Sequence, residues 1–194
     1  MRNIAILASG SGTNAENIIK YFSNKKVAKV RLVLSNRREA FVLKRAETLN
    51  VKTCFFDRND FYASGKVLDT LIQNGIDFVV LAGFLWLVPE SILEKYERRI
   101  VNIHPALLPR YGGKGMYGEK VHKAVLENHD TESGITIHYV NTHYDEGDII
   151  FQARCRVESL DTPDSLASRV HALEYEHYPK VIESLILKLQ NSFK

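Results

Sequence analysis

Cysteine is scarce in this chain: only Cys54 and Cys155 occur, and they stand far apart among 194 residues. Their spacing fits neither a disulfide framework nor a CxxC metal or redox motif. The seven histidines show no HExxH or Cys/His metal spacing. We therefore expect reduced thiols, no metal site and a cytoplasmic location.

Long hydrophobic runs are also missing. The most apolar stretch, residues 78–88, contains Gly83 and ends at Pro89, well short of the roughly 20 residues of a membrane-spanning helix. Residues 1–8 have the pattern of a strand and lack the charged and apolar regions of a secretory signal. We expect a soluble protein that is not exported and has no membrane partner.

Neither the basic nor the acidic residues are concentrated in one segment of the sequence. The 26 basic and 23 acidic residues leave a formal charge of +3, and the basic residues form no stripe of the kind that binds nucleic acid. This distribution favours a small anionic ligand over a nucleic-acid partner. A length of 194 residues with 45% hydrophobic content predicts one domain over residues 1–194.

What the sequence does contain is an alternation of β-branched segments with segments of helical spacing. This predicts an α/β fold with a Rossmann-like, mostly parallel sheet and helices on both faces. Strands are expected at residues 3–8, 30–34, 52–56, 78–81 and 99–103, with helices at 14–22, 41–49 and 65–74. Residues 135–140 and 149–157 predict antiparallel neighbours and a mixed sheet toward the C-terminus. A last helix should begin near Pro163 and kink or break at Pro179.

The sequence SGSGTN at residues 9–14 follows the first strand and opens a helix. Amides at a helix N-terminus bind anions, and the glycines allow close approach, so the turn is a candidate phosphate site. It lacks the GK[ST] ending of a P-loop and the third glycine of GxGxxG. An ordinary tight turn is an equally good explanation of these residues alone.

Asn102 and His104 end the expected strand at residues 99–103, two positions apart, so both can point to one side. A carboxamide can donate to an oxyanion, and an imidazole can donate or shuttle a proton. Asp145 lies in a glycine-containing turn, and a carboxylate near an imidazole raises its pKa. Each residue taken singly also has a purely structural explanation. The loop at residues 112–118 contains Lys114, which could meet an anion.

Four segments together, SGSGTN, VVLAGF at residues 79–84, NIHPALLP at residues 102–109 and DEGDII at residues 145–150, resemble folate-dependent formyltransferases along nearly the whole chain. The turn and the short chain resemble the glycinamide ribonucleotide branch of that family. The resemblance implies transfer of a formyl group from 10-formyltetrahydrofolate to the amine of glycinamide ribonucleotide, without metal or ATP, by a monomer or weak homodimer.

The resemblance also implies roles for individual residues. Asn102 and His104 would stabilise the oxyanion of a tetrahedral intermediate, and Asp145 would keep His104 protonated. The remaining matches are Gly12, Thr13 and Asn14 for the substrate phosphate, Glu174 for the glycinamide substrate, and Arg58, Leu85, Trp86, Leu87, Val88 and Asn102 for the folate.

The chain departs from the family pattern at Trp86, where arginine is frequent, at Tyr175, where histidine is common, and in its glycine-rich loop. Alternatives remain open at this level. They are an amino-sugar or methionyl-tRNA formyltransferase, a formylfolate hydrolase, a nucleotide-binding oxidoreductase on fold alone, and a non-catalytic binding module.

Overall fold

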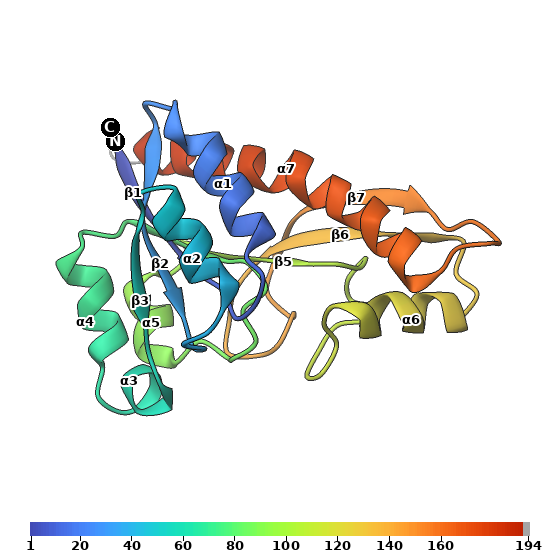
Figure 1. Ribbon diagram of the computed structural model, residues 1–194, viewed down its shortest axis with the longest axis horizontal. Coiled ribbons are helices and arrows are strands. Elements are labelled where there is room, and N and C mark those ends of the chain that lie inside the picture. The colour runs from blue at the N-terminus through green and yellow to red at the C-terminus, as the bar shows by residue number, and fades with distance from the viewer. Residues whose placement is uncertain (192–194) are drawn as a thin grey trace.

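The computed structural model describes residues 1–191 and is built around one seven-stranded sheet with the order β3-β2-β1-β4-β5-β6-β7 (Figure 1). Strands β1 to β5 are parallel, whereas β6 pairs antiparallel with both β5 and β7. The predicted mixed α/β sheet is thus confirmed. The strands are β1 Arg2–Leu7, β2 Ala28–Ser35, β3 Lys52–Phe55, β4 Phe78–Leu81, β5 Ile100–His104, β6 Glu132–Tyr139 and β7 Ile149–Arg156.

Helices cover both faces of the parallel part, as predicted. Alternate residues of β1 enter opposite hydrophobic clusters: Ile4 and Ile6 pack with α1, α2, α6 and α7, while Ala5 and Leu7 pack with α3, α4 and α5. The helices are α1 Thr13–Ser23, α2 Phe41–Thr48, α3 Arg58–Tyr62, α4 Lys66–Gln73, α5 Glu90–Lys95, α6 Glu119–Glu127 and α7 Pro163–Asn191.

The sequence pattern did not predict helices α3, α5 and α6. Helices α3 and α5 have five and six residues, too few for a helical period to show. Helix α3 nevertheless carries a local start signal, a capping box in which Asp57 and Asp60 bond each other's backbone amides. Within residues 1–191, no helix combines the length and apolar character that crossing a membrane requires.

Helix α7 passes through Pro179 without the expected break and runs for 29 residues. A proline has no N–H, so the carbonyl of Tyr175, four residues earlier, loses its helical partner. The side chain of Asn17 on α1 donates to that carbonyl at 2.9 Å. On the buried side, the hydroxyl of Tyr178 donates to the carbonyls of Leu81 and Val101. These tertiary hydrogen bonds therefore stabilise the helix around Pro179.

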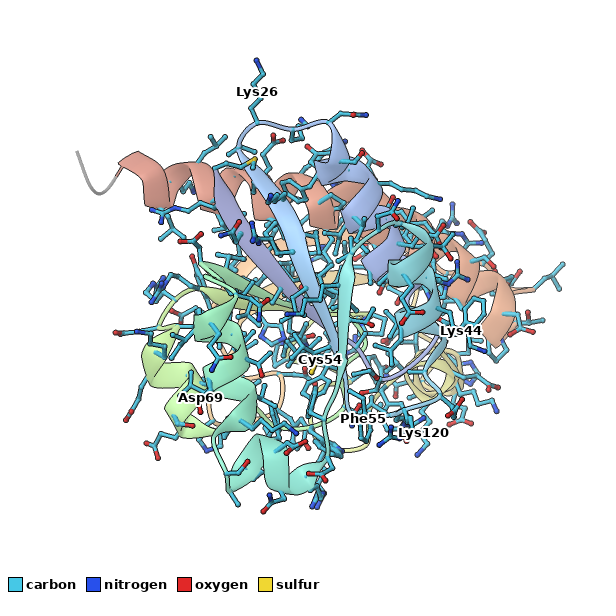
Figure 2. The ribbon with its side chains drawn as sticks, turned by 60° about the vertical axis from the view of Figure 1, so that its left-hand side comes forward. Lys26, Lys44, Cys54, Phe55, Asp69 and Lys120 are labelled. Atoms are coloured by element: carbon cyan, nitrogen blue, oxygen red, sulfur yellow. The ribbon has the colours of Figure 1, made fainter. Side chains whose placement is uncertain are left out.

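Lysines are dispersed over the surface. Lys26, in the turn after α1, projects from one end of the molecule, far from Lys44 on α2 and Lys120 on α6 (Figure 2). Lys26 therefore does not form one basic patch with Lys44 and Lys120.

The sheet has a topological switch point between β1 and β4. From β1 the chain continues outward through β2 and β3, and then returns to β4 on the other side of β1. Ligands of open α/β sheets bind where the carboxyl ends of such strands diverge. The segments that leave these ends are residues 8–12 after β1, residues 82–89 after β4 and the loop after His104.

Candidate active site

Asn102, His104 and Asp145 lie together at the carboxyl end of β5. Nδ1 of His104 is 3.5 Å from Oδ2 of Asp145, and Nδ2 of Asn102 is 3.4 Å from Oδ1 of the same carboxylate. All three side chains are largely shielded from solvent; His104 is only 4% exposed. The structure therefore assembles the three residues that spacing alone could not bring together.

Antiparallel pairing of β6 with β5 and β7 is what carries Asp145 to this place. Asp145 has a left-handed backbone with φ of 59°, which aspartate tolerates better than most residues. Close to it, a Cβ on Gly147 would lie 1.7 Å from the carbonyl oxygen of Tyr139. A glycine is thus required for the turn to fold back on the end of β6.

His138 also belongs to the site, although no sequence motif singled it out. It is buried on β6, directly opposite Asn102 in the strand register. Its Nδ1 donates to the carbonyl of Tyr139 at 2.8 Å, so in the neutral ring Nε2 accepts from Nδ2 of Asn102 at 3.1 Å. This bond orients the Asn102 carboxamide. The alternation along β6 could have indicated the inward side chain, but only the register shows its partner.

His104 is held through its other ring nitrogen. Nε2 lies 2.7 Å from the carbonyl oxygen of Tyr111, which can only accept, so Nε2 carries a proton. In the neutral ring Nδ1 is therefore the unprotonated atom, and it faces Asp145.

Two opposing effects act on the protonation of His104, and the expected effect of the Asp145 charge is the smaller one. Burial lowers the pKa of His104, and this outweighs the opposite effects of the Asp145 charge and the Tyr111 carbonyl. Asp145 itself stays ionised: burial opposes this, but contacts with His138, His104 and the Gly113 amide hold its pKa below the usual range. Both directions favour a carboxylate beside a neutral imidazole.

The predicted phosphate turn forms the uncapped N-terminus of α1. Gly12 occupies the N-cap position with φ of 77°, and no side chain caps the helix. A Cβ on Gly12 would lie 2.4 Å from Cγ2 of Val42, so this glycine also allows α1 to pack against α2. Amides of Thr13 and Asn14 at the start of the helix lie on the wall of the main cavity. Such a helix end favours an anion.

Glu174 lies beside this turn, as the resemblance implied. It is 5% exposed, and its Oε2 accepts from Nδ2 of Asn14 at 2.8 Å. Burial raises the pKa of Glu174 despite this bond and the nearby charge of His171. Two further histidines, His171 on α7 and His122 on α6, line the same cavity. Burial lowers the pKa of His122 to about 4.

The predicted folate residues divide into two groups. Arg58, Leu85 and Trp86 line the cavity, and the Arg58 guanidinium lies 5.2 Å from the centre of the Trp86 ring. Leu87 and Val88 lie outside its lining. Val88 is buried in the hydrophobic cluster that also contains residues of α3, α4 and α5.

One cavity of about 620 Å³ joins all these features. Its wall contains the uncapped turn, Glu174, the Asn102–His104–Asp145 group, and the aromatic segment with Arg58. The glycine-rich loop with Lys114 borders it as well. Such a cavity can hold a phosphorylated amine and an elongated second molecule at the same proton-transferring group.

Comparison with known proteins identifies the family. A family model described as formyl transferase matches residues 2–182. This chain belongs to the formyl transferase family. The predicted resemblance to formyltransferases is thereby confirmed.

Individual relatives of this formyltransferase agree with this family assignment. It is 36% identical over 186 residues to the phosphoribosylglycinamide formyltransferase of Escherichia coli, covering 93% of this chain and 85% of that protein. It is 39% identical to a chloroplastic protein of the same name from Arabidopsis thaliana, covering 95% of this chain but 65% of the relative. The chain thus spans slightly less than two thirds of that plant protein.

A solved structure shows the same fold. The crystal structure of phosphoribosylglycinamide formyltransferase from Bacillus halodurans superposes with a TM-score of 0.87 at 36% identity, covering 98% of each chain. The fold and the family of this formyltransferase therefore rest on agreement along almost the whole sequence.

Proposed function

We propose that this protein transfers the formyl group of 10-formyltetrahydrofolate to the amine of glycinamide ribonucleotide, as one domain over residues 1–194. The observation that carries the proposal is that one cavity is lined by His104 and Asp145, by an uncapped helix N-terminus and by an aromatic segment. Relatives named phosphoribosylglycinamide formyltransferase support the choice of acceptor.

The acceptor occupies the side formed by α1 and α7. Its phosphate accepts hydrogen bonds from the free amides of Gly12, Thr13 and Asn14. Glu174, which is held by its hydrogen bond from Asn14, accepts hydrogen bonds from hydroxyl or amine groups of the substrate. This arrangement places the acceptor amine over the His104 group.

The donor occupies the opposite side. Its pteridine lies against the backbone that follows β4, where the amide of Leu85 is fixed by the Ser9 hydroxyl and the carbonyl of Leu87 accepts from Tyr62. The rest of the donor extends past Trp86 toward Arg58, whose guanidinium suits a carboxylate.

The chemistry follows from the neutral state of His104. The acceptor nitrogen attacks the formyl carbon, a C–N bond forms, and the carbonyl electrons move to oxygen. The second N–H of Asn102 makes only the long contact with Asp145, and we assign it to this oxyanion. Proximity of the two substrates supplies much of the acceleration.

Proton transfer completes the step. Nδ1 of His104 takes the proton from the attacking nitrogen, and Asp145 stabilises the imidazolium that results. The proton then passes to the folate nitrogen, the bond from that nitrogen to the formyl carbon breaks, and the carbonyl re-forms. The step uses neither a metal ion nor ATP. We place the enzyme in the cytoplasm as a monomer or weak homodimer, with no nucleic-acid or membrane partner.

An absorbance assay for folate deformylation tests the function. Glycinamide ribonucleotide should start turnover, whereas the dephosphorylated riboside, an amino sugar nucleotide and methionyl-tRNA should react at least 10²-fold more slowly, as expected when a bound group that positions the amine is lost. Faster reaction with another acceptor would reject the assignment. Thermal stabilisation by NAD(P) instead of the folate would favour an oxidoreductase.

A further inference from the structure

Tyr111 has a backbone conformation that is unfavourable for its residue type. Its φ of 57° lies in the left-handed region, which a bulky aromatic side chain rarely adopts. Two glycines, Gly112 and Gly113, follow directly, yet the chain places the left-handed conformation on the tyrosine as well as on Gly113. Non-glycine residues in this region cluster at functional sites, where the surroundings hold them in place.

The carbonyl of Tyr111 shows what this conformation achieves. It points at Nε2 of His104 and accepts its hydrogen at 2.7 Å. The His104 ring is buried, and its other ring nitrogen, Nδ1, lies 3.5 Å from Oδ2 of Asp145. The Tyr111 carbonyl therefore decides which ring nitrogen carries the proton in the neutral imidazole.

The side chain of Tyr111 is anchored on the opposite side. Its hydroxyl donates to Oδ2 of Asp130 at 2.7 Å, and Nη2 of Arg110 donates to Oδ1 at 2.7 Å. The Arg110 guanidinium also lies 5.2 Å from the centre of the tyrosine ring. Asp130 lies in the short connection between α6 and β6, so the anchor is outside the glycine-rich loop.

We propose that Tyr111 is a positioning residue for formyl transfer: anchored by Asp130, it holds its carbonyl against Nε2 of His104, so that Nδ1 remains the proton-transferring atom. The proposal rests on the role assigned above to His104. The next loop residues reinforce it, because the amide of Gly113 donates to Oδ2 of Asp145 at 3.0 Å. One short segment thus fixes both partners of the pair.

Removing the anchor makes the proposal testable. Tyr111→Phe keeps the ring and deletes the bond to Asp130. The carbonyl then loses its fixed direction, its bond to His104 weakens, and the pKa of His104 falls because that bond favours the charged ring. The other groups facing His104 are Asp145 on the β6–β7 turn, His138 on β6 and His122 on α6, all unchanged in the variant.

A matched control is Tyr21→Phe. Tyr21 is also half-buried and also donates to a carboxylate, Glu183, at 2.5 Å, but it joins α1 to α7 and does not line the cavity. We expect Tyr111→Phe to lower kcat at least fivefold while both KM values change less than twofold, and to move the acid limb of the pH profile downward. Tyr21→Phe should leave kcat and the profile unchanged.

NMR titration of the His104 ring separates this inference from the proposed function, because it needs no turnover. A lower imidazole pKa and faster exchange of the Nε2 hydrogen in Tyr111→Phe would support the anchor. An unchanged ring titration with parental kcat would overturn it. A parent enzyme inactive toward glycinamide ribonucleotide would instead reject the function and leave the ring titration to decide the role of Tyr111.

Asp130→Ala removes the same anchor from its other end and covers the case in which Tyr111→Phe folds poorly. The two substitutions delete one interaction, so the double variant should lose no more kcat than either single variant. Multiplicative losses would mean that the two residues act separately, which contradicts the proposal.

Discussion

Replacing Asp145 with asparagine is the most direct test of the proposed proton transfer. The substitution suits the backbone, because asparagine tolerates the left-handed conformation found at this position. It removes the negative charge 3.5 Å from Nδ1 of His104. At an effective dielectric of about 20, two unit charges at this distance attract by about 5 kcal/mol.

Part of that attraction should survive as the dipole of the carboxamide. We therefore expect the imidazolium to lose about 3 kcal/mol, which corresponds to a fall in kcat of about 10². Binding of either substrate should change much less, since neither the phosphate turn nor the aromatic wall is altered.

The pH dependence gives the sign of the coupling. The Asp145 charge raises the pKa of His104 against the larger effect of burial, so its removal lowers that pKa further. Because the neutral ring accepts the proton, the acid limb of kcat should move to lower pH. The assay combines a pH-rate profile with NMR titration of the His104 ring. Parental kcat, or an unchanged or raised imidazole pKa in a folded variant, would refute the reasoning.

Three further predictions concern the frame around the site. Gly12→Ala should lower the melting temperature, because the added Cβ would collide with Val42 on α2. Gly10→Ala, where the added Cβ has open space, should change the free energy of unfolding by less than about 0.5 kcal/mol. Equal losses of stability for the two variants in calorimetry would contradict this prediction. The free energy of unfolding should fall by up to about 3 kcal/mol as pH drops from about 6.5 to 4, because His122 takes up its proton only in the unfolded chain. Denaturant titrations should show this slope flattened in His122→Gln but not in His129→Gln, at an exposed position. Asn17→Ala should lower the free energy of unfolding by about 1 kcal/mol, because it leaves the carbonyl of Tyr175 without its hydrogen-bond donor. A stability equal to that of the parent would mean that water replaces the Asn17 amide.

The parts of the fold that the sequence predicted are those with local signals. The strand at residues 78–81 is a continuous apolar run that begins directly after Asp77 and ends shortly before Gly83, and its bounds agree with β4. The turn before α1 was predictable because glycines and a following helical period stand next to each other. Helix α6 was not, because a glycine-rich loop precedes it and its buried face comprises only Val121, His122 and Val125.

The residues of the site likewise divide into those that the sequence predicted and those that it did not. Asn102 and His104 could be predicted as neighbours because two positions along a strand place side chains on one side. The contributions of His138 and Tyr111 depend on strand register and on a carbonyl direction, which no spacing encodes. The lowered pKa of His104 was missed for a related reason: a charged neighbour can be inferred from a motif, but the extent of burial cannot.

The unbroken helix α7 affects the order in which the molecule can mature. Glu174, which accepts from Asn14, and Tyr178, which donates to the carbonyls of Leu81 and Val101, both belong to α7, which follows all seven strands in the chain. A chain still emerging from the ribosome can pair β1 to β5 but has neither contact. The contacts of Glu174 and Tyr178 can therefore form only after α7 has been synthesised, and shortened chains that lack α7 would expose the apolar face of the sheet to chaperones and proteases.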